Sequence, residues 1–124
     1  MNRWFALILI FIPMSVAAAE QQKSVPVQFQ GEWNSNLKHC GTNLNDSRLI
    51  LSAAHIQFYE SNGPIKAIVT EGQFELALIS KLSGEGGNWL SYRQYRLSAD
   101  RSKLTDVTNE NSKFVRYRCP KNSK

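Results

Sequence analysis

Short stretches in which apolar and polar residues alternate recur along most of the sequence, and turn residues separate them. In residues 73–82, for example, Phe74, Leu76 and Leu78 would lie on one face of an extended chain and the intervening residues on the other. Alternation with a period of two is typical of a β-strand that buries one face. Helical spacing of apolar residues is rare in this chain. The pattern therefore predicts an all-β fold.

The turn residues divide these stretches into about seven short strands. We expect the strands at residues 25–33, 47–52, 55–60, 65–70, 73–82, 89–98 and 112–119. Asn62-Gly63 and Glu71-Gly72 are hairpin signals, whereas residues 100–110 do not alternate and are expected to form a loop or a single helical turn. We therefore predict a small antiparallel up-and-down β-barrel, or a sandwich, of about seven to eight strands. Closure into a barrel would remove the open edges of the sheet.

The first 19 residues differ in composition from the rest of the chain. A positive start at Arg3, an apolar run over residues 4–12 and a small-residue ending at Ala19 are the three parts of a secretory signal peptide. The run is shorter than the ~20 residues that a membrane-spanning helix needs, and no later segment reaches that length. We expect cleavage near Ala19 and a periplasmic or secreted protein, in which residues 20–124 form one barrel domain with a short flexible C-terminal tail.

Cys40 and Cys119 are the only cysteines, and both follow the predicted signal peptide. An even cysteine count in a small exported domain favours a disulfide. The bond would close a loop of about 80 residues and constrain the unfolded chain by roughly 4.5 kcal/mol. It would also tie together the two ends of the chain that a closed barrel must join. A Cys-x-x-Cys motif is absent, and only His39 and His55 could complete a metal site, so we predict no bound metal.

The first predicted strand contains the motif Phe29-Gln30-Gly31-Glu32-Trp33. This motif resembles the Gly-x-Trp start of lipocalins and related calycin barrels. The resemblance implies a cup-shaped barrel in which Trp33 plugs one end and a basic residue from a later strand packs on its ring, a contact worth about 0.5–2 kcal/mol. Arg116 or Arg118 in the last predicted strand would supply that cation. The resemblance also implies a pocket for an apolar ligand.

The residues that carry catalysis in other proteins form no recognisable pattern in this chain. Its acidic residues are scattered, and it contains no nucleophile elbow, zinc-protease motif or phosphate-binding loop. Gly84-Glu85-Gly86-Gly87 lies between two predicted strands, whereas a phosphate-binding loop requires a helix N-terminus after its glycines. We therefore predict no catalytic residues, no cofactor and no enzymatic activity.

The formal net charge is +5, and basic residues gather towards the C-terminus. In the last predicted strand, alternation places Val115, Tyr117 and Cys119 on the expected core face. The opposite face, together with a paired strand at residues 89–98, would form a basic and aromatic surface. The candidate binding residues on this surface are Arg93, Arg96, Phe114, Arg116 and Arg118.

Two functions fit these observations. The first is a protein-binding module of the inhibitor or immunity type, whose basic surface would favour an acidic protein partner. The alternative is a lipocalin-like carrier of a small apolar or amphipathic ligand. We expect a monomer without an integral membrane segment, and no nucleic-acid partner, because export separates the protein from nucleic acid.

Overall fold

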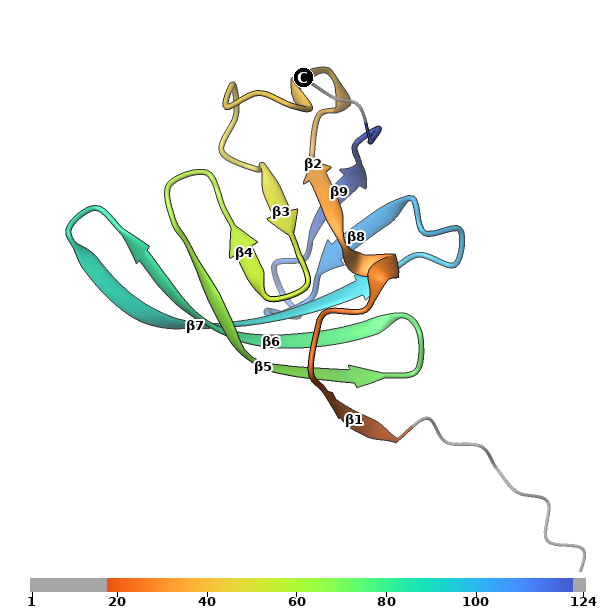
Figure 1. Cartoon of the computed structure of the whole chain (residues 1–124). Coiled ribbons are helices and arrows are strands. Elements are labelled where there is room, and N and C mark those ends of the chain that lie inside the picture. The colour runs from red at the N-terminus through yellow and green to blue at the C-terminus, as the bar shows by residue number, and fades with distance from the viewer. Residues whose placement is uncertain (1–17, 122–124) are drawn as a thin grey trace, which may run out of the picture.

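The structure, a computed structural model, describes residues 18–121. Within this range the chain forms nine strands and two short 3-10 helices (Figure 1). The strands are β1 (Ala19–Gln22), β2 (Gly31–Asn34), β3 (Leu49–Leu51), β4 (His55–Gln57), β5 (Asn62–Glu71), β6 (Glu75–Gly84), β7 (Gly87–Leu97), β8 (Lys103–Asp106) and β9 (Phe114–Arg118). The helices are η1 (Val27–Phe29) and η2 (Leu37–His39).

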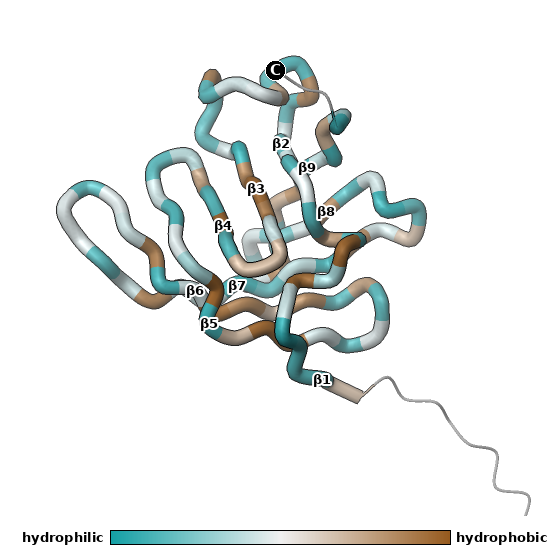
Figure 2. Tube along the Cα trace, viewed as in Figure 1, coloured by the Kyte–Doolittle hydropathy of each residue, from teal (hydrophilic) through white to brown (hydrophobic). Residues whose placement is uncertain are grey.

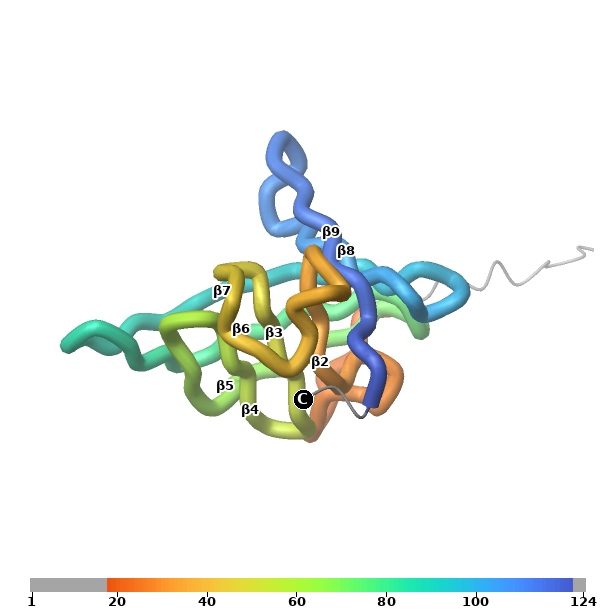
Figure 3. The backbone as a smooth tube through the Cα atoms, turned by 90° about the horizontal axis from the view of Figure 1, so that it is seen from above, coloured from red at the N-terminus to blue at the C-terminus, as the bar shows by residue number. Residues whose placement is uncertain are grey.

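Strands β2 to β9 form a closed antiparallel barrel of eight strands. Each strand pairs with the next one along the chain, and β9 returns to pair with β2. Strand β1 lies outside this ring, beside the C-terminal half of β5, where Gln22 pairs with Ile68. In Figures 1 and 3 the end of the β6–β7 hairpin extends beyond the turn between β4 and β5. The predicted all-β fold and antiparallel barrel are confirmed.

Apolar side chains from the strands and from the segment before β2 fill the interior of the barrel. The buried cluster consists of Val25, Phe29, Trp33, Leu49, Leu51, Ile56, Ile68, Leu76, Leu78, Leu82, Tyr95, Leu97 and Leu104. In Figure 2 hydrophobic colour runs along β3, whereas the loops are mostly hydrophilic. Predicted alternation is confirmed in β6, where Leu76, Leu78 and Leu82 are buried, but Phe74 precedes the strand and is 38% exposed.

The prediction of a first strand over residues 25–33 is wrong in its first half. Residues 27–29 form η1, in which the Phe29 amide donates to the carbonyl of Pro26. In an extended strand Val25, Val27 and Phe29 would share one face, whereas here Val25 and Phe29 are buried and Val27 is 77% exposed. Strand β2 begins only at Gly31, whose φ of 128° suits glycine.

The prediction of a loop or helical turn over residues 100–110 is also wrong, because this segment contains β8. The strand lies between β7 and β9 and pairs with both. Consequently β7 and β9 do not pair directly. The predicted binding surface required that pairing, so this part of the prediction is wrong. Only Leu104 of this four-residue strand is fully buried, so alternation could not reveal it.

The predicted hairpin between β4 and β5 exists, but Asn62-Gly63 is not its turn. The chain reverses at residues 59–60, between Phe58 and Ser61, where the Phe58 amide donates to the carbonyl of Ser61 at 2.7 Å. Gly63 instead lies within β5, and a Cβ at this position would overlap the backbone oxygen of Lys81. The glycine is required by the close approach of two strands rather than by a turn.

The barrel closes at a narrow seam between β2 and β9. Only two residue pairs form this ladder, Trp33 with Arg118 and Asn34 with Tyr117. The predicted disulfide between Cys40 and Cys119 lies at the end of the seam, with a Cα–Cα distance of 5.7 Å, and is confirmed. The bond therefore ties the chain after β2 to the chain after β9.

Most of the predicted signal peptide lies outside the described residues, which begin at Ala18. Ala19, at its predicted end, is the first residue of β1 and pairs with Glu71. Residues 122–124 of the predicted tail also lie outside the described range. In the part of the chain that the structure describes, no helix has the length and apolar character needed to cross a membrane.

Candidate functional site

Strand β9 turns a different face to the barrel interior from the one that the sequence suggested. Phe114 and Arg116 pair with Asp106 and Leu104 of β8, and residues directly opposite in a ladder share a face. Since Leu104 is fully buried, Arg116 points inward and is only 8% exposed. The expectation that Val115 and Tyr117 form the core face is wrong; each is 38% exposed.

Long side chains explain this reversal. Arg118 and Arg116 lie near the two ends of the barrel, where a long stem can be buried while the guanidinium reaches polar groups. The first of them, Arg118, closes the end that contains Trp33. Its guanidinium carbon lies 4.2 Å from the centroid of the Trp33 ring. The predicted packing of a basic residue on this tryptophan is therefore present.

Backbone carbonyls complete the closed end. Arg118 donates to the carbonyls of Gln28 at 2.6 Å, Gln30 at 3.0 Å and Arg101 at 2.9 Å. The Trp33 indole donates to the Phe29 carbonyl at 3.0 Å. Burial, followed by the nearby charge of Arg101, lowers the pKa of Arg118. These contacts leave Arg118 a structural role rather than a place on an open binding surface.

The opposite end of the barrel contains a pocket of about 440 Å³ that opens to solvent. Its lining combines two arginines, polar groups of the loops before β3 and β9, and two aromatic rings. The lining residues are Asp46, Ser47, Phe58, Arg93, Asp106, Asn109, Ser112, Phe114 and Arg116. Three of the predicted binding residues, Arg93, Phe114 and Arg116, thus meet in what we call the open-end pocket.

Arg116 is the buried cation of the open-end pocket. Its Nε donates to the Ser47 carbonyl at 2.7 Å, and its guanidinium carbon lies 4.8 Å from the centroid of the Phe114 ring. Its Nη1 is buried and has no hydrogen-bond partner. Within residues 18–121 this arginine forms no ion pair. Burial, which disfavours the charged form, lowers its pKa, and the opposing influence of Tyr95 and Asp106 is smaller.

Three further polar residues lie near this cation. Arg93 lies at the rim, 46% exposed by its side chain, with its Nη1 at 3.5 Å from a carboxylate oxygen of Asp106. The other oxygen of Asp106 accepts from the amide and hydroxyl of Thr108. In the barrel beneath, Tyr95 is fully buried, its hydroxyl lacks a partner, and burial raises its pKa.

The remaining predicted residues do not join the open-end pocket. Arg96 lies elsewhere on β7 and donates to Glu75 at 2.6 Å. A wider hollow of about 680 Å³ lies outside the closed end, beside Arg118, but that guanidinium already has three carbonyl partners. The pocket was not predicted because Arg116 points into the barrel. An inward-facing arginine does not follow the alternation of apolar inward and polar outward residues from which the faces of β9 were assigned.

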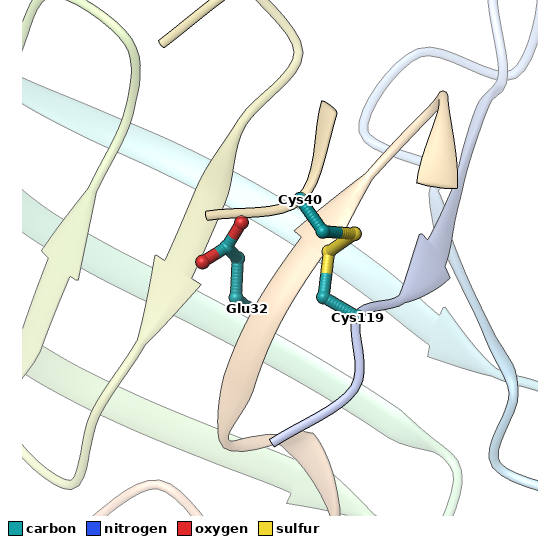
Figure 4. Close-up of side chains that lie close together, drawn as sticks. All are labelled: Glu32, Cys40 and Cys119. Carbon is teal, nitrogen blue, oxygen red and sulfur yellow. A yellow bond between two sulfur atoms is a disulfide. The ribbon is translucent and has the colours of Figure 1, made fainter. Parts of the chain in front are cut away.

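Glu32, Cys40 and Cys119 lie close together beside the seam, as Figure 4 shows. The two sulfur atoms are bonded to each other. One oxygen of Glu32 accepts from the Gly41 amide, and the other lies 3.3 Å from Arg48. The ligand atoms of this group are thus already engaged, which fits a structural role at the barrel seam.

Comparison with known proteins adds no further constraint, because no protein-family model, curated protein or solved structure matches the chain.

Proposed function

We propose that this protein is an exported, non-enzymatic binding module of the inhibitor or immunity type, and that a partner protein inserts an acidic side chain into the open-end pocket. The observation that carries the proposal is Arg116 itself, which is buried in the pocket wall and forms no ion pair within residues 18–121, although Asp46 and Asp106 also line the pocket. A buried guanidinium with a free N–H is costly unless an anion or another acceptor completes its hydrogen bonds.

A carboxylate is the group that fits this position best. It would accept a charge-assisted hydrogen bond from the Arg116 guanidinium, which lines the pocket, and Arg93 at the rim would add a second positive charge. Ser112 lines the same pocket, and its hydroxyl can donate to the second oxygen of the carboxylate. The Phe58 and Phe114 rings would cover the apolar stem of a glutamate or aspartate side chain.

The alternative function is a lipocalin-like carrier. The contact between Trp33 and Arg118 supports membership of the calycin-like barrels, since it is the arrangement that the Gly-x-Trp resemblance implies. Against a carrier stands the apolar cluster that fills the barrel interior, because a small barrel packed with its own side chains leaves no room for an apolar ligand. The binding module therefore accounts for the geometry better.

Export to the periplasm or another oxidising compartment is part of the proposal. The N-terminal residues have the composition of a secretory signal. A disulfide between Cys40 and Cys119 is stable in such compartments and rare in the cytosol.

The test is an NMR titration with an oligoglutamate peptide, with oligoglutamine of the same length as the uncharged control. We expect saturable shifts at the Arg116 Nε–H and at the Ser47 and Ser112 amides with oligoglutamate only. Arg93→Gln, at the exposed rim, should weaken binding without affecting the fold, and Arg116→Gln should abolish it. Lys66→Gln removes one exposed charge outside the pocket and should bind like the wild type.

Shifts that spread evenly over the basic surface, or that Arg93→Gln and Lys66→Gln reduce equally, would contradict a specific site. A fluorescent fatty-acid probe tests the carrier alternative. Saturable uptake of that probe into the barrel, unaffected by Arg93→Gln, would favour the carrier instead.

A further inference from the structure

The β6–β7 hairpin has one edge that the barrel does not cover. Strand β7 spans Gly87–Leu97, but β8 pairs only with Tyr95, Arg96 and Leu97. Within the described residues, the segment 87–93 has a ladder partner only on its β6 side. The end of this hairpin projects past the β4–β5 turn (Figures 1 and 3), so the uncovered edge is accessible.

The register identifies the backbone groups that point outward. Gly84 and Gly87 pair next to the two-residue turn, and the pair that flanks such a turn exchanges hydrogen bonds. Every second residue of β7 from Gly87 onward therefore bonds to β6, and the residues between them point away. Gln94 confirms this assignment, because its carbonyl accepts from Val107 and its amide donates to Thr108 at 2.9 Å each.

Asn88, Leu90 and Tyr92 consequently direct their N–H and C=O groups away from β6, with no ladder partner in the described part of the chain. Their side chains lie on the outer face of the hairpin, opposite Ser83, Lys81 and Ile79. Leu90 is 71% exposed and Tyr92 is 52% exposed.

This edge lacks the features that usually protect a free strand. Natural edge strands carry charged residues, proline or a bulge that prevents pairing with another chain. Residues 87–92, Gly-Asn-Trp-Leu-Ser-Tyr, contain no charge and no proline, and their ladder with β6 is regular from Gly87 to Arg96. The sequence is therefore suited to pairing.

We propose that two copies of this chain pair through these edges, antiparallel, with Leu90 of each copy opposite Leu90 of the partner subunit. In this register Asn88 lies opposite Tyr92 of the partner subunit, and the three outward residues of each strand exchange about six hydrogen bonds. A two-fold axis through the central leucine pair makes the edge complementary to itself.

Side chains and charges agree with this register. The two leucines contact each other on the outer face, with Lys81 opposite each of them in the ladder with β6 and the Tyr92–Ile79 pair beside them. On the inner face Trp89 lies beside Ser91 of the partner subunit. Arg93 falls opposite Gly87 of the partner subunit, so no like charges face each other directly. Because this pairing would satisfy the free backbone N–H and C=O groups of both edges, it favours a dimer over the monomer expected from the sequence.

Sedimentation equilibrium from low micromolar to millimolar concentration tests the pairing, with hydrogen exchange measured at both ends of that range. We expect a concentration-dependent dimer in which the amides of Asn88, Leu90 and Tyr92 are protected only at high concentration. Those of Trp89, Ser91 and Arg93, which bond to β6, should be protected throughout.

Leu90→Lys should weaken dimerisation roughly tenfold or more, because it places two like charges opposite each other. The matched control is Leu44→Lys, at a leucine that is 72% exposed in a loop away from the edge, and it should dimerise like the wild type. Arg93→Gln, used above, should leave the dimer intact, so failure of the pocket and failure of the dimer are distinguishable.

A monomer at every concentration would overturn the proposal. So would a dimer in which the three outward amides exchange freely, or one that Leu44→Lys and Leu90→Lys weaken equally.

Discussion

Removing the disulfide should destabilise this domain more than almost any other single change. The bond joins Cys40 to Cys119, which are 79 residues apart in the sequence. Closing a loop of that length restricts the unfolded chain by about 4.5 kcal/mol on the chain-entropy model, and measured losses of native disulfides are about 2–5 kcal/mol. The bond also lies beside the seam between β2 and β9, where the ladder itself contains only two residue pairs.

The change is the double substitution Cys40→Ser with Cys119→Ser, followed by thermal and urea unfolding. A loss of at least 2 kcal/mol lowers the Tm of a domain of this size by about 10 °C or more. Wild-type protein unfolded in a thiol reductant is the control and should match the double variant. A Tm of the double variant only a few degrees below that of the wild type would refute the stabilisation expected from the loop length. A large difference in Tm between the reduced wild type and the double variant would also refute it.

Three other expectations concern single residues. Arg118→Met removes the cation and three hydrogen bonds at the closed end and should cost roughly 2–4 kcal/mol in urea unfolding; a loss below about 0.5 kcal/mol would contradict that role. Gly63→Ala forces a Cβ against a neighbouring backbone oxygen and should cost about 3 kcal/mol. Gly87→Ala, whose Cβ would come no nearer than 4.0 Å to the Gly84 carbonyl oxygen, should cost much less in the same assay. Asp100 accepts hydrogen bonds from Ser102 and Ser98 that lower its pKa to about 2. Its contribution to stability is therefore present above its unfolded pKa and disappears as the pH falls towards 2. Ser102→Ala should raise the titration midpoint of the Asp100 carboxyl measured by NMR, and an unchanged midpoint would disprove the assignment.

The sequence predicted the overall fold because most strands bury one face. Alternation in residues such as Leu76, Leu78 and Leu82 is sufficient to identify a strand and its inward side. The disulfide was predicted from the even cysteine count of a small exported domain, and the contact of a basic residue with Trp33 from the resemblance of the Gly-x-Trp motif to lipocalins; both are present in the structure.

Other features could not be predicted, for reasons that lie in the tertiary structure. Strand β8 has a single fully buried residue, Leu104, and is held by its two neighbours rather than by its own pattern. The inward face of β9 was assigned wrongly because hydropathy treats Arg116 as a surface residue, whereas the open end of the barrel accommodates its long stem. The open-end pocket was therefore visible only once the strands had been placed.

The narrow seam has a consequence for how the domain forms. Of the eight ladders that close the barrel, seven join strands that follow each other in the chain, and only that of β2 with β9 joins distant segments. Each hairpin can form as soon as its own residues are available, whereas the ring closes only when β9 pairs with β2. The entropy cost of bringing these two distant segments together is therefore concentrated in that last step. A chain that ended before Phe114 would hold its hairpins and still present β2 and β8 as open edges. The final five-residue strand thus determines whether this sequence becomes a closed domain or a sheet prone to aggregation.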